Sequence, residues 1–146
     1  MPKKSSWVVG ALTVAVLGLT GCAAKVAAEE TPEVAVKVQP IAGTDRSTVT
    51  LTPTAIARIG LETEKVRPAP AGHVGVVSYG AVLYDAAGAT WVYTSPAARS
   101  FMRRPVVVDR VDGDVAYLKK GPKVGTTVVK VGVPELFGAE YGVGGE

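Results

Sequence analysis

The sequence has few of the side chains that build metal and thiol sites. One cysteine (Cys22), one histidine (His73) and two methionines occur among its 146 residues. A single cysteine excludes an internal disulfide and a cysteine-based zinc cluster, and a single histidine excludes a multi-histidine metal site. We therefore expect no metal and no cofactor, and the composition argues against an enzyme.

Leucine and isoleucine are also scarce for a chain in which 47% of the residues are hydrophobic. Valine occurs 26 times, against 8 leucines and 3 isoleucines, whereas a helical bundle would be rich in leucine and alanine. Valine-rich chains with frequent glycine and proline form short β-strands joined by turns. The predicted fold is mainly β, a small barrel-like or sandwich-like body with one or two short helices.

An apolar segment follows a short basic start at the N-terminus. Lys3 and Lys4 precede an uncharged stretch from Ser5 to Ala24, whose apolar centre runs from Trp7 to Leu19. This centre has the length of the hydrophobic region of a secretory signal and is shorter than the ~20 residues of a membrane-spanning helix. We expect residues 1–21 to be a signal peptide; an uncleaved membrane anchor is the alternative.

The apolar segment ends at Leu19, Thr20, Gly21 and Cys22. An aliphatic residue and two small residues before a cysteine resemble the lipobox of bacterial lipoproteins. That resemblance implies that the Cys22 thiol receives a diacylglycerol, that cleavage occurs before Cys22 and that the new amino group is acylated as well. Each buried methylene of an acyl chain stabilises the membrane-bound state by about 0.8 kcal/mol, so the lipid bilayer would hold the protein firmly.

The anchor predicts where the protein resides. Positive residues before an apolar segment stay in the cytoplasm, so the chain after Cys22 lies on the extracytoplasmic face of the cell membrane. This face is the periplasmic side if an outer membrane is present. Lys3 and Lys4 supply two of the three formal net positive charges, so the mature chain is nearly neutral and we expect no nucleic-acid partner.

The mature chain divides into a tether and a β-rich body. Residues 22–46 contain no aromatic side chain and predict a flexible tether. Val34–Val38 alternates apolar with small or charged residues, which leaves an edge strand as the alternative there. We place the body at residues 47–141 and a frayed tail at residues 142–146.

Local signals predict the elements of the body. Thr52 and Pro53 are typical of the first residues of a helix, and Gly60 is a typical helix stop. Asp112-Gly113 is the strongest hairpin signal, and a second hairpin is expected between residues 74–84 and 90–94. We predict His73 to be a solvated loop residue. The predicted strands cover residues 47–51, 61–66, 74–84, 90–94, 101–111, 115–119 and 126–131, with a short helical segment at 134–137.

Several stretches of the body resemble one family. They are Val49-Thr-Leu-Thr-Pro, Arg58-Ile-Gly-Leu-Glu-Thr-Glu-Lys-Val, Tyr79-Gly-Ala-Val-Leu-Tyr-Asp and, after Gly88, Thr90-Trp-Val-Tyr. With the segments that follow, they are similar to the membrane-proximal β-domain of periplasmic adaptor subunits, the membrane fusion proteins of RND-type efflux systems. The resemblance covers residues 48–141. The lipoyl and α-hairpin domains of those adaptors have no counterpart, because only residues 67–78 stand where they would be inserted.

The resemblance implies a non-enzymatic adaptor or accessory subunit in transmembrane transport. Its partner would be an inner-membrane RND or ABC transporter, and the sequence leaves open whether the chain also forms a homo-oligomer. Arg103 and Arg104 are candidates for the partner contact. The alternative for these two arginines is a solvated strand edge that deters aggregation.

Two other classes of function stay open. A stand-alone lipid-anchored β-domain would bind a ligand or a component of the cell envelope, through a face that carries Trp91 and Tyr93. An enzyme would depend on the acidic residues Asp85, Asp109, Asp112 and Asp114. Asp112-Gly113-Asp114 is typical of a turn and lacks the ligand spacing of a calcium loop.

Overall fold

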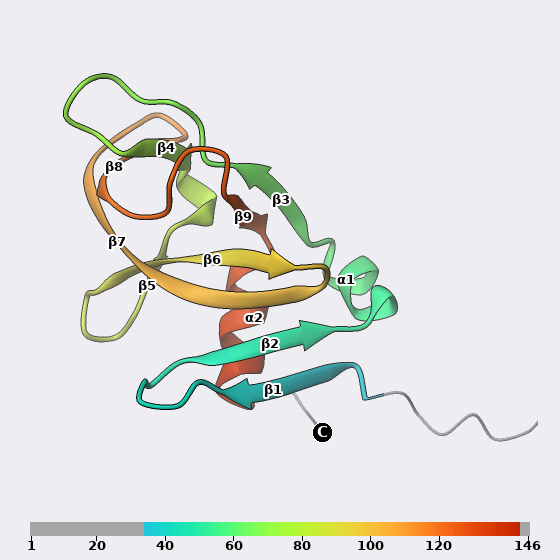
Figure 1. The fold of residues 1–146 in the computed structure, drawn as a ribbon. Coiled ribbons are helices and arrows are strands. Elements are labelled where there is room, and N and C mark those ends of the chain that lie inside the picture. The colour runs from blue at the N-terminus through green and yellow to red at the C-terminus, as the bar shows by residue number, and fades with distance from the viewer. Residues whose placement is uncertain (1–33, 144–146) are drawn as a thin grey trace, which may run out of the picture. The chain divides into compact units, whose positions relative to one another are not determined.

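The computed structural model describes residues 34–143, which belong to one compact unit, Pro32–Glu146. The predicted mainly β fold with short helices is confirmed over these residues (Figure 1). Neither α-helix in this part of the chain has the length and apolarity needed to cross a bilayer. The elements are β1 (Val36–Pro40), β2 (Ser47–Leu51), α1 (Pro53–Ile59), β3 (Glu62–Lys65), β4 (Gly75–Ser78), a 3-10 turn (Tyr79–Ala81), β5 (Leu83–Tyr84), β6 (Thr90–Ala97), β7 (Ser100–Asp112), β8 (Val115–Lys120), β9 (Thr127–Val131) and α2 (Val133–Glu140).

Strand β7 connects the whole sheet. Its first residues pair with β2 and its middle pairs with β6, both antiparallel. Its last part, from Val107 to Asp112, pairs with β8, which in turn pairs with β4. The main path runs β1-β2-β7-β6-β9-β3 and does not close, so β1 and β3 are its two edges. Figure 1 shows β7 as a long curved ribbon that pairs with β2 and β6 along its first half and with β8 along its last part.

The central strands are covered on both faces. One face packs against α1 and α2 and forms the helix-side core: Val49, Leu51, Ala55, Tyr93, Phe101, Val129, Val133 and Leu136. The other face packs against β4 and β8 and forms the β8-side core: Val66, Val77, Ala81, Val92, Val106, Ala116, Leu118 and Val128. Neighbouring residues on a strand point to opposite faces, so Val128 and Val129 enter different cores. The valine excess thus reflects strands that are apolar on both sides.

The local signals that predicted α1 and the β7–β8 hairpin are confirmed. The Thr52 hydroxyl accepts a hydrogen bond from the Ala55 backbone N–H at 3.1 Å, as an N-cap residue does. Gly60 ends the helix in the left-handed conformation with φ 62°. Gly113 takes φ 56° in the turn between β7 and β8.

The sequence assigned too long a segment to the tether. Residues 36–46, placed in the tether of residues 22–46, form β1 and its turn into β2. Five residue pairs, from Val36↔Leu51 to Pro40↔Ser47, join the two strands, and Val36 packs against the helix-side core. This cross-strand ladder outweighs the local polar composition of the segment. Residues 22–33 of the predicted tether lie outside the described residues, as does the signal peptide.

The predicted hairpin between residues 74–84 and 90–94 is mostly wrong. Only the short β5 pairs with β6, whereas β4 pairs with β8. The 3-10 turn at Tyr79–Ala81 redirects the chain between β4 and β5, and it includes Gly80, where a Cβ atom would lie 3.2 Å from the Lys130 carbonyl oxygen. This close approach of two backbones separates the predicted strand into two elements on different parts of the sheet.

Truncation of Leu118 should test the importance of the β8-side core. Leu118 is fully buried, so we expect Leu118→Ala to lower the free energy of unfolding by about 2–5 kcal/mol. Val111→Ala on β7 is the control, because Val111 is 41% exposed and its truncation should cost much less. Urea denaturation of both variants measures the difference. Equal losses would contradict a second core on this face.

Candidate functional site

The two candidate partner-contact residues, Arg103 and Arg104, lie on opposite faces of β7. Arg103 is 1% exposed and points toward α2, whereas Arg104 is exposed on the other side. Successive strand residues alternate between faces, so adjacent arginines are separated in this way. Arg103 therefore offers no surface to a partner, which corrects the expectation for this residue. Arg104 stays accessible.

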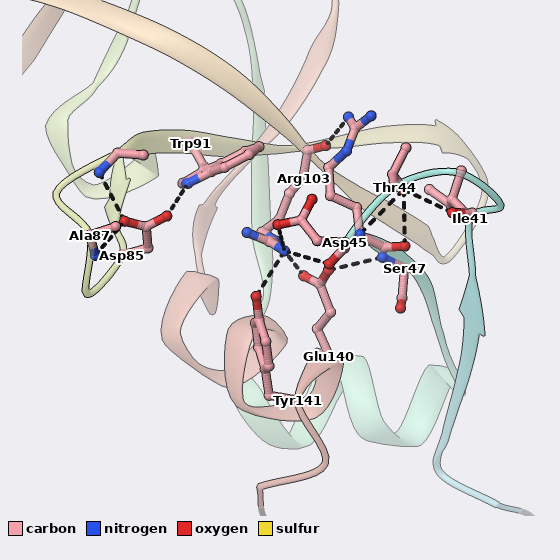
Figure 2. Close-up of polar contacts among 12 residues, drawn as sticks. Ile41, Thr44, Asp45, Ser47, Asp85, Ala87, Trp91, Arg103, Glu140 and Tyr141 are labelled. Carbon is pink, nitrogen blue, oxygen red and sulfur yellow. Dashed lines mark hydrogen bonds and ion pairs between the residues drawn. The ribbon is translucent and has the colours of Figure 1, made fainter.

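The Arg103 guanidinium donates hydrogen bonds to two segments of the chain, the end of α2 and the β1–β2 turn. Nε donates to Glu140 Oε2 at 2.8 Å, and Nη2 donates to the Tyr141 hydroxyl at 3.0 Å. Nη2 also donates to the Asp45 backbone oxygen at 3.2 Å. Figure 2 shows the guanidinium between the end of α2 and the turn that joins β1 to β2. One side chain of β7 thus joins both ends of the described chain to the sheet.

Glu140 is equally well satisfied. Its side chain is 2% exposed, and its carboxylate accepts from the Tyr93 hydroxyl at 2.5 Å in addition to Arg103. The other oxygen, Oε1, accepts from the Ser47 backbone N–H at 3.0 Å. A buried charge is tolerated only when it is paired and hydrogen-bonded, and this carboxylate meets both conditions.

The ionisation of the neighbouring groups follows from this pairing. Desolvation by itself would lower the pKa of Arg103, but the hydrogen bond and the negative charge of Glu140 raise it above its usual value. Burial, followed by the hydrogen bond to Glu140, raises the pKa of the Tyr93 hydroxyl far above its ordinary 10.0. Arg103 thus keeps its positive charge and Tyr93 stays a neutral donor.

Aromatic rings surround the guanidinium. The Arg103 Cζ atom lies 4.6 Å from the centroid of the Trp91 ring and 5.4 Å from that of Tyr141. Phe137 is slightly farther, at 5.8 Å. Contacts of this kind contribute about 0.5–2 kcal/mol each, with the larger values for desolvated pairs. They compensate part of the cost of removing the guanidinium from water.

Asp85 orients Trp91 within this cluster. Asp85 Oδ2 accepts a hydrogen bond from the indole Nε1 at 2.9 Å, while Oδ1 accepts from the backbone N–H groups of Ala87 and Ala89. Gly88 completes the turn with φ 79°. The hydrogen bond from Trp91, with smaller contributions from the two backbone donors, lowers the pKa of Asp85. The sequence identified the turn; its link to the indole was missed.

Together these residues form a structural clamp, which we call the Arg103 clamp: Asp85, Trp91, Tyr93, Arg103, Glu140 and Tyr141. Its polar groups bind one another and the backbone. The clamp holds α2 against β6 and β7 and fixes the β1–β2 turn. The clamp is centred on the buried Arg103–Glu140 ion pair, and its role is structural: it positions α2 and the β1–β2 turn relative to β7.

His73 belongs to a second cluster. The prediction of a solvated loop residue is wrong, because its side chain is only 10% exposed. His73 Nε2 lies 2.9 Å from Asp109 Oδ2, and Lys119 Nζ lies 2.5 Å from Asp109 Oδ1. The His73 ring also packs edge-on against Tyr117. Lys119, and after it His73, lowers the pKa of Asp109. These contacts join the loop before β4 to the β7–β8 hairpin.

The remaining candidate site residues are Cys22, Leu19, Thr20 and Gly21, and they lie outside the described residues 34–143. Arg104, by contrast, is exposed and lines a surface pocket between β6, β7 and the loop after β8. No family model, no curated protein and no solved structure matches the chain.

Removal of the Arg103 charge should be strongly destabilising. We expect Arg103→Met to lower the free energy of unfolding by about 3–5 kcal/mol, because the Glu140 carboxylate would then be buried without its partner. The double variant Arg103→Met/Glu140→Gln should regain part of this loss. Arg104→Gln is the matched control and should change stability by less than about 0.5 kcal/mol. Equal urea midpoints for Arg103→Met and Arg104→Gln would contradict the clamp.

Replacement of Trp91 by phenylalanine should raise the pKa of Asp85. The indole N–H is the largest cause of the lowered value, and phenylalanine removes it. A carboxylate with a lowered folded pKa stabilises the fold above its ordinary pKa of 3.8, and this stabilisation is lost as the pH falls through the lowered value. In Trp91→Phe, the free energy of unfolding should therefore fall less as the pH is lowered through this range.

Carbon-13 NMR titration of the side-chain carboxyl groups measures this effect directly. Asp109 is the internal control, because its low pKa depends on Lys119 and His73 and should not move. An unchanged titration of Asp85 in the Trp91→Phe variant would show that the indole hydrogen bond does not hold its charge.

Proposed function

We propose that the chain is a lipid-anchored protein of the extracytoplasmic membrane face that acts as a non-enzymatic adaptor or accessory subunit of an efflux transporter. The observation that carries the proposal is the order of its segments. Leu19-Thr20-Gly21-Cys22 comes first, and a β-body that includes the region of adaptor resemblance, residues 48–141, follows after a short link.

The length of the link limits where the body can be. Residues 23–33 separate Cys22 from Val34, where the described body begins. A fully extended chain covers at most about 3.6 Å per residue, so the start of the body lies within roughly 40 Å of an anchored Cys22. A body held so close to the bilayer is suited to contact the external face of a membrane transporter.

The edge of the sheet supports a contact with another protein. Strand β1 pairs with β2 on one side, and in the described residues no strand covers its other side. Free backbone N–H and C=O groups at such an edge can pair with an extended segment of a partner. Because β1 follows directly after the link, this edge belongs to the part of the body that is closest in sequence to the anchor.

Replacement of Cys22 should release the protein from the membrane. Cys22→Ala removes the thiol that would carry the diacylglycerol, so we expect the protein to leave the membrane fraction and its mass to lack the acyl chains. Thr20→Ser keeps a small residue in the lipobox and should leave attachment unchanged. Fractionation with mass spectrometry of the purified protein measures both. Normal attachment and mass in Cys22→Ala would refute the anchor.

Co-purification tests the transporter partner separately. The wild-type chain, extracted in mild detergent after cross-linking in intact cells, should retain a multi-spanning RND or ABC permease. Cys22→Ala should lose this partner, because the body no longer stays at the membrane. Reproducible absence of any such permease, with unchanged drug and metal tolerance on deletion of the gene, would contradict the adaptor function and leave the lipid anchor intact.

A further inference from the structure

A pocket of about 470 Å³ opens where the end of β6, the middle of β7 and the loop between β8 and β9 meet. Its volume is within the range of pockets that hold small molecules. It lies on the face of β7 opposite the Arg103 clamp, because Arg104 lines it. Three further features of its lining indicate what it could bind: its charge, its hydroxyl groups and its restricted backbone.

The pocket is positively charged. Arg104 and Lys123 both line it, and none of its nine lining residues is acidic. The ion pairs found in residues 34–143 involve other cations: His73, Arg103, Lys119 and Lys130. Within the described part of the chain, two positive charges therefore face one open pocket without a carboxylate to neutralise them.

Three hydroxyl groups also belong to the lining of the pocket. Thr94 and Ser95 donate their hydroxyl protons to the backbone oxygens of Met102 and Ala97, at 3.2 and 3.0 Å. The third hydroxyl in the lining belongs to Thr126, which is half-buried. A guanidinium fork, an ammonium group and one hydroxyl thus line the same space.

The backbone around the pocket has restricted conformational freedom. Pro96, Pro105 and Pro122 line it, and their rings fix the backbone φ angle. The loop after β8 is also held close to the core, since a Cβ atom on Gly121 would lie 3.2 Å from side-chain atoms of Leu118 and Val106. A preformed site loses little conformational entropy on binding.

We propose that this pocket binds the phosphate group of a small ligand. A phosphate monoester carries about two negative charges near neutral pH and presents three acceptor oxygens. Arg104 provides the planar fork that suits two of these oxygens, Lys123 provides a compact charge, and Thr126 provides a further donor. A single carboxylate would balance only one of the two cations. The site is independent of a transporter partner.

Two sources can supply this group, a phospholipid headgroup or a soluble phosphorylated molecule. The first test uses inorganic pyrophosphate as the probe, titrated by calorimetry into the full chain in non-ionic detergent at constant ionic strength. We expect Arg104→Gln and Lys123→Gln each to weaken binding by about tenfold, because each removes one charge-assisted contact. Lys123→Arg keeps the charge and should retain binding.

Arg58→Gln and Lys37→Gln are the matched controls, because both residues are exposed cations outside the pocket. Their affinity should stay within about twofold of the wild type, as general charge effects are screened by salt. Circular dichroism melting checks that every variant is folded. Equal losses in the pocket and control variants, or unchanged binding in Arg104→Gln and Lys123→Gln, would overturn the site.

A second titration replaces pyrophosphate with a soluble short-chain phosphatidic acid, whose headgroup is a phosphate monoester. Binding of both probes that depends on Arg104 supports a site that accepts a lipid headgroup, and binding of pyrophosphate alone supports a soluble phosphorylated ligand. A hexaglutamate peptide is the third probe. Pocket-dependent binding of this peptide without any response to the two phosphate probes would assign the pocket to an acidic polypeptide and overturn the proposal.

Discussion

The buried ion pair between Arg103 and Glu140 is the interaction on which the rest of the fold depends. Both side chains are almost fully removed from water, so each must find a complete set of partners. Those partners come from β6, from the β1–β2 turn, from the first residue of β2 and from the residue after α2. Satisfying two charges in the interior therefore fixes the relative positions of segments that lie far apart in the sequence.

The long strand β7 gives this ion pair its setting. It pairs with β2, β6 and β8 in turn, and its residues enter a core on each face of the sheet. The next two strands of the main path, β6 and β9, are buried on both faces at their centres, where Val92 and Tyr93, and Val128 and Val129, are consecutive apolar residues. Burial on both faces accounts for part of the abundance of valine. Among the charged residues of β7 only Arg103 is buried, and aromatic rings surround its guanidinium.

The alternation of side chains along β7 also separates structure from surface chemistry. Arg103 points to the interior and holds α2, while Arg104 points to a pocket that carries a second cation, Lys123. The same backbone thus anchors a structural clamp on one side and presents positive charge on the other. A pocket with two positive charges and no acidic residue in its lining is suited to the phosphate group proposed for it.

The sequence by itself determined the mainly β class, the α1 caps at Thr52 and Gly60 and the turn at Asp112-Gly113, because each depends on residues that are neighbours in the chain. The lipid anchor at Cys22 is likewise a local pattern and stays a prediction. Only the tertiary structure decided that Arg103 is buried, that His73 contacts Asp109 and that β4 pairs with β8. Arg103 and Glu140 are 37 positions apart, and His73 and Asp109 are 36 apart. No local pattern encodes such contacts, since they form when the packing of two cores brings distant strands and the C-terminal helix together.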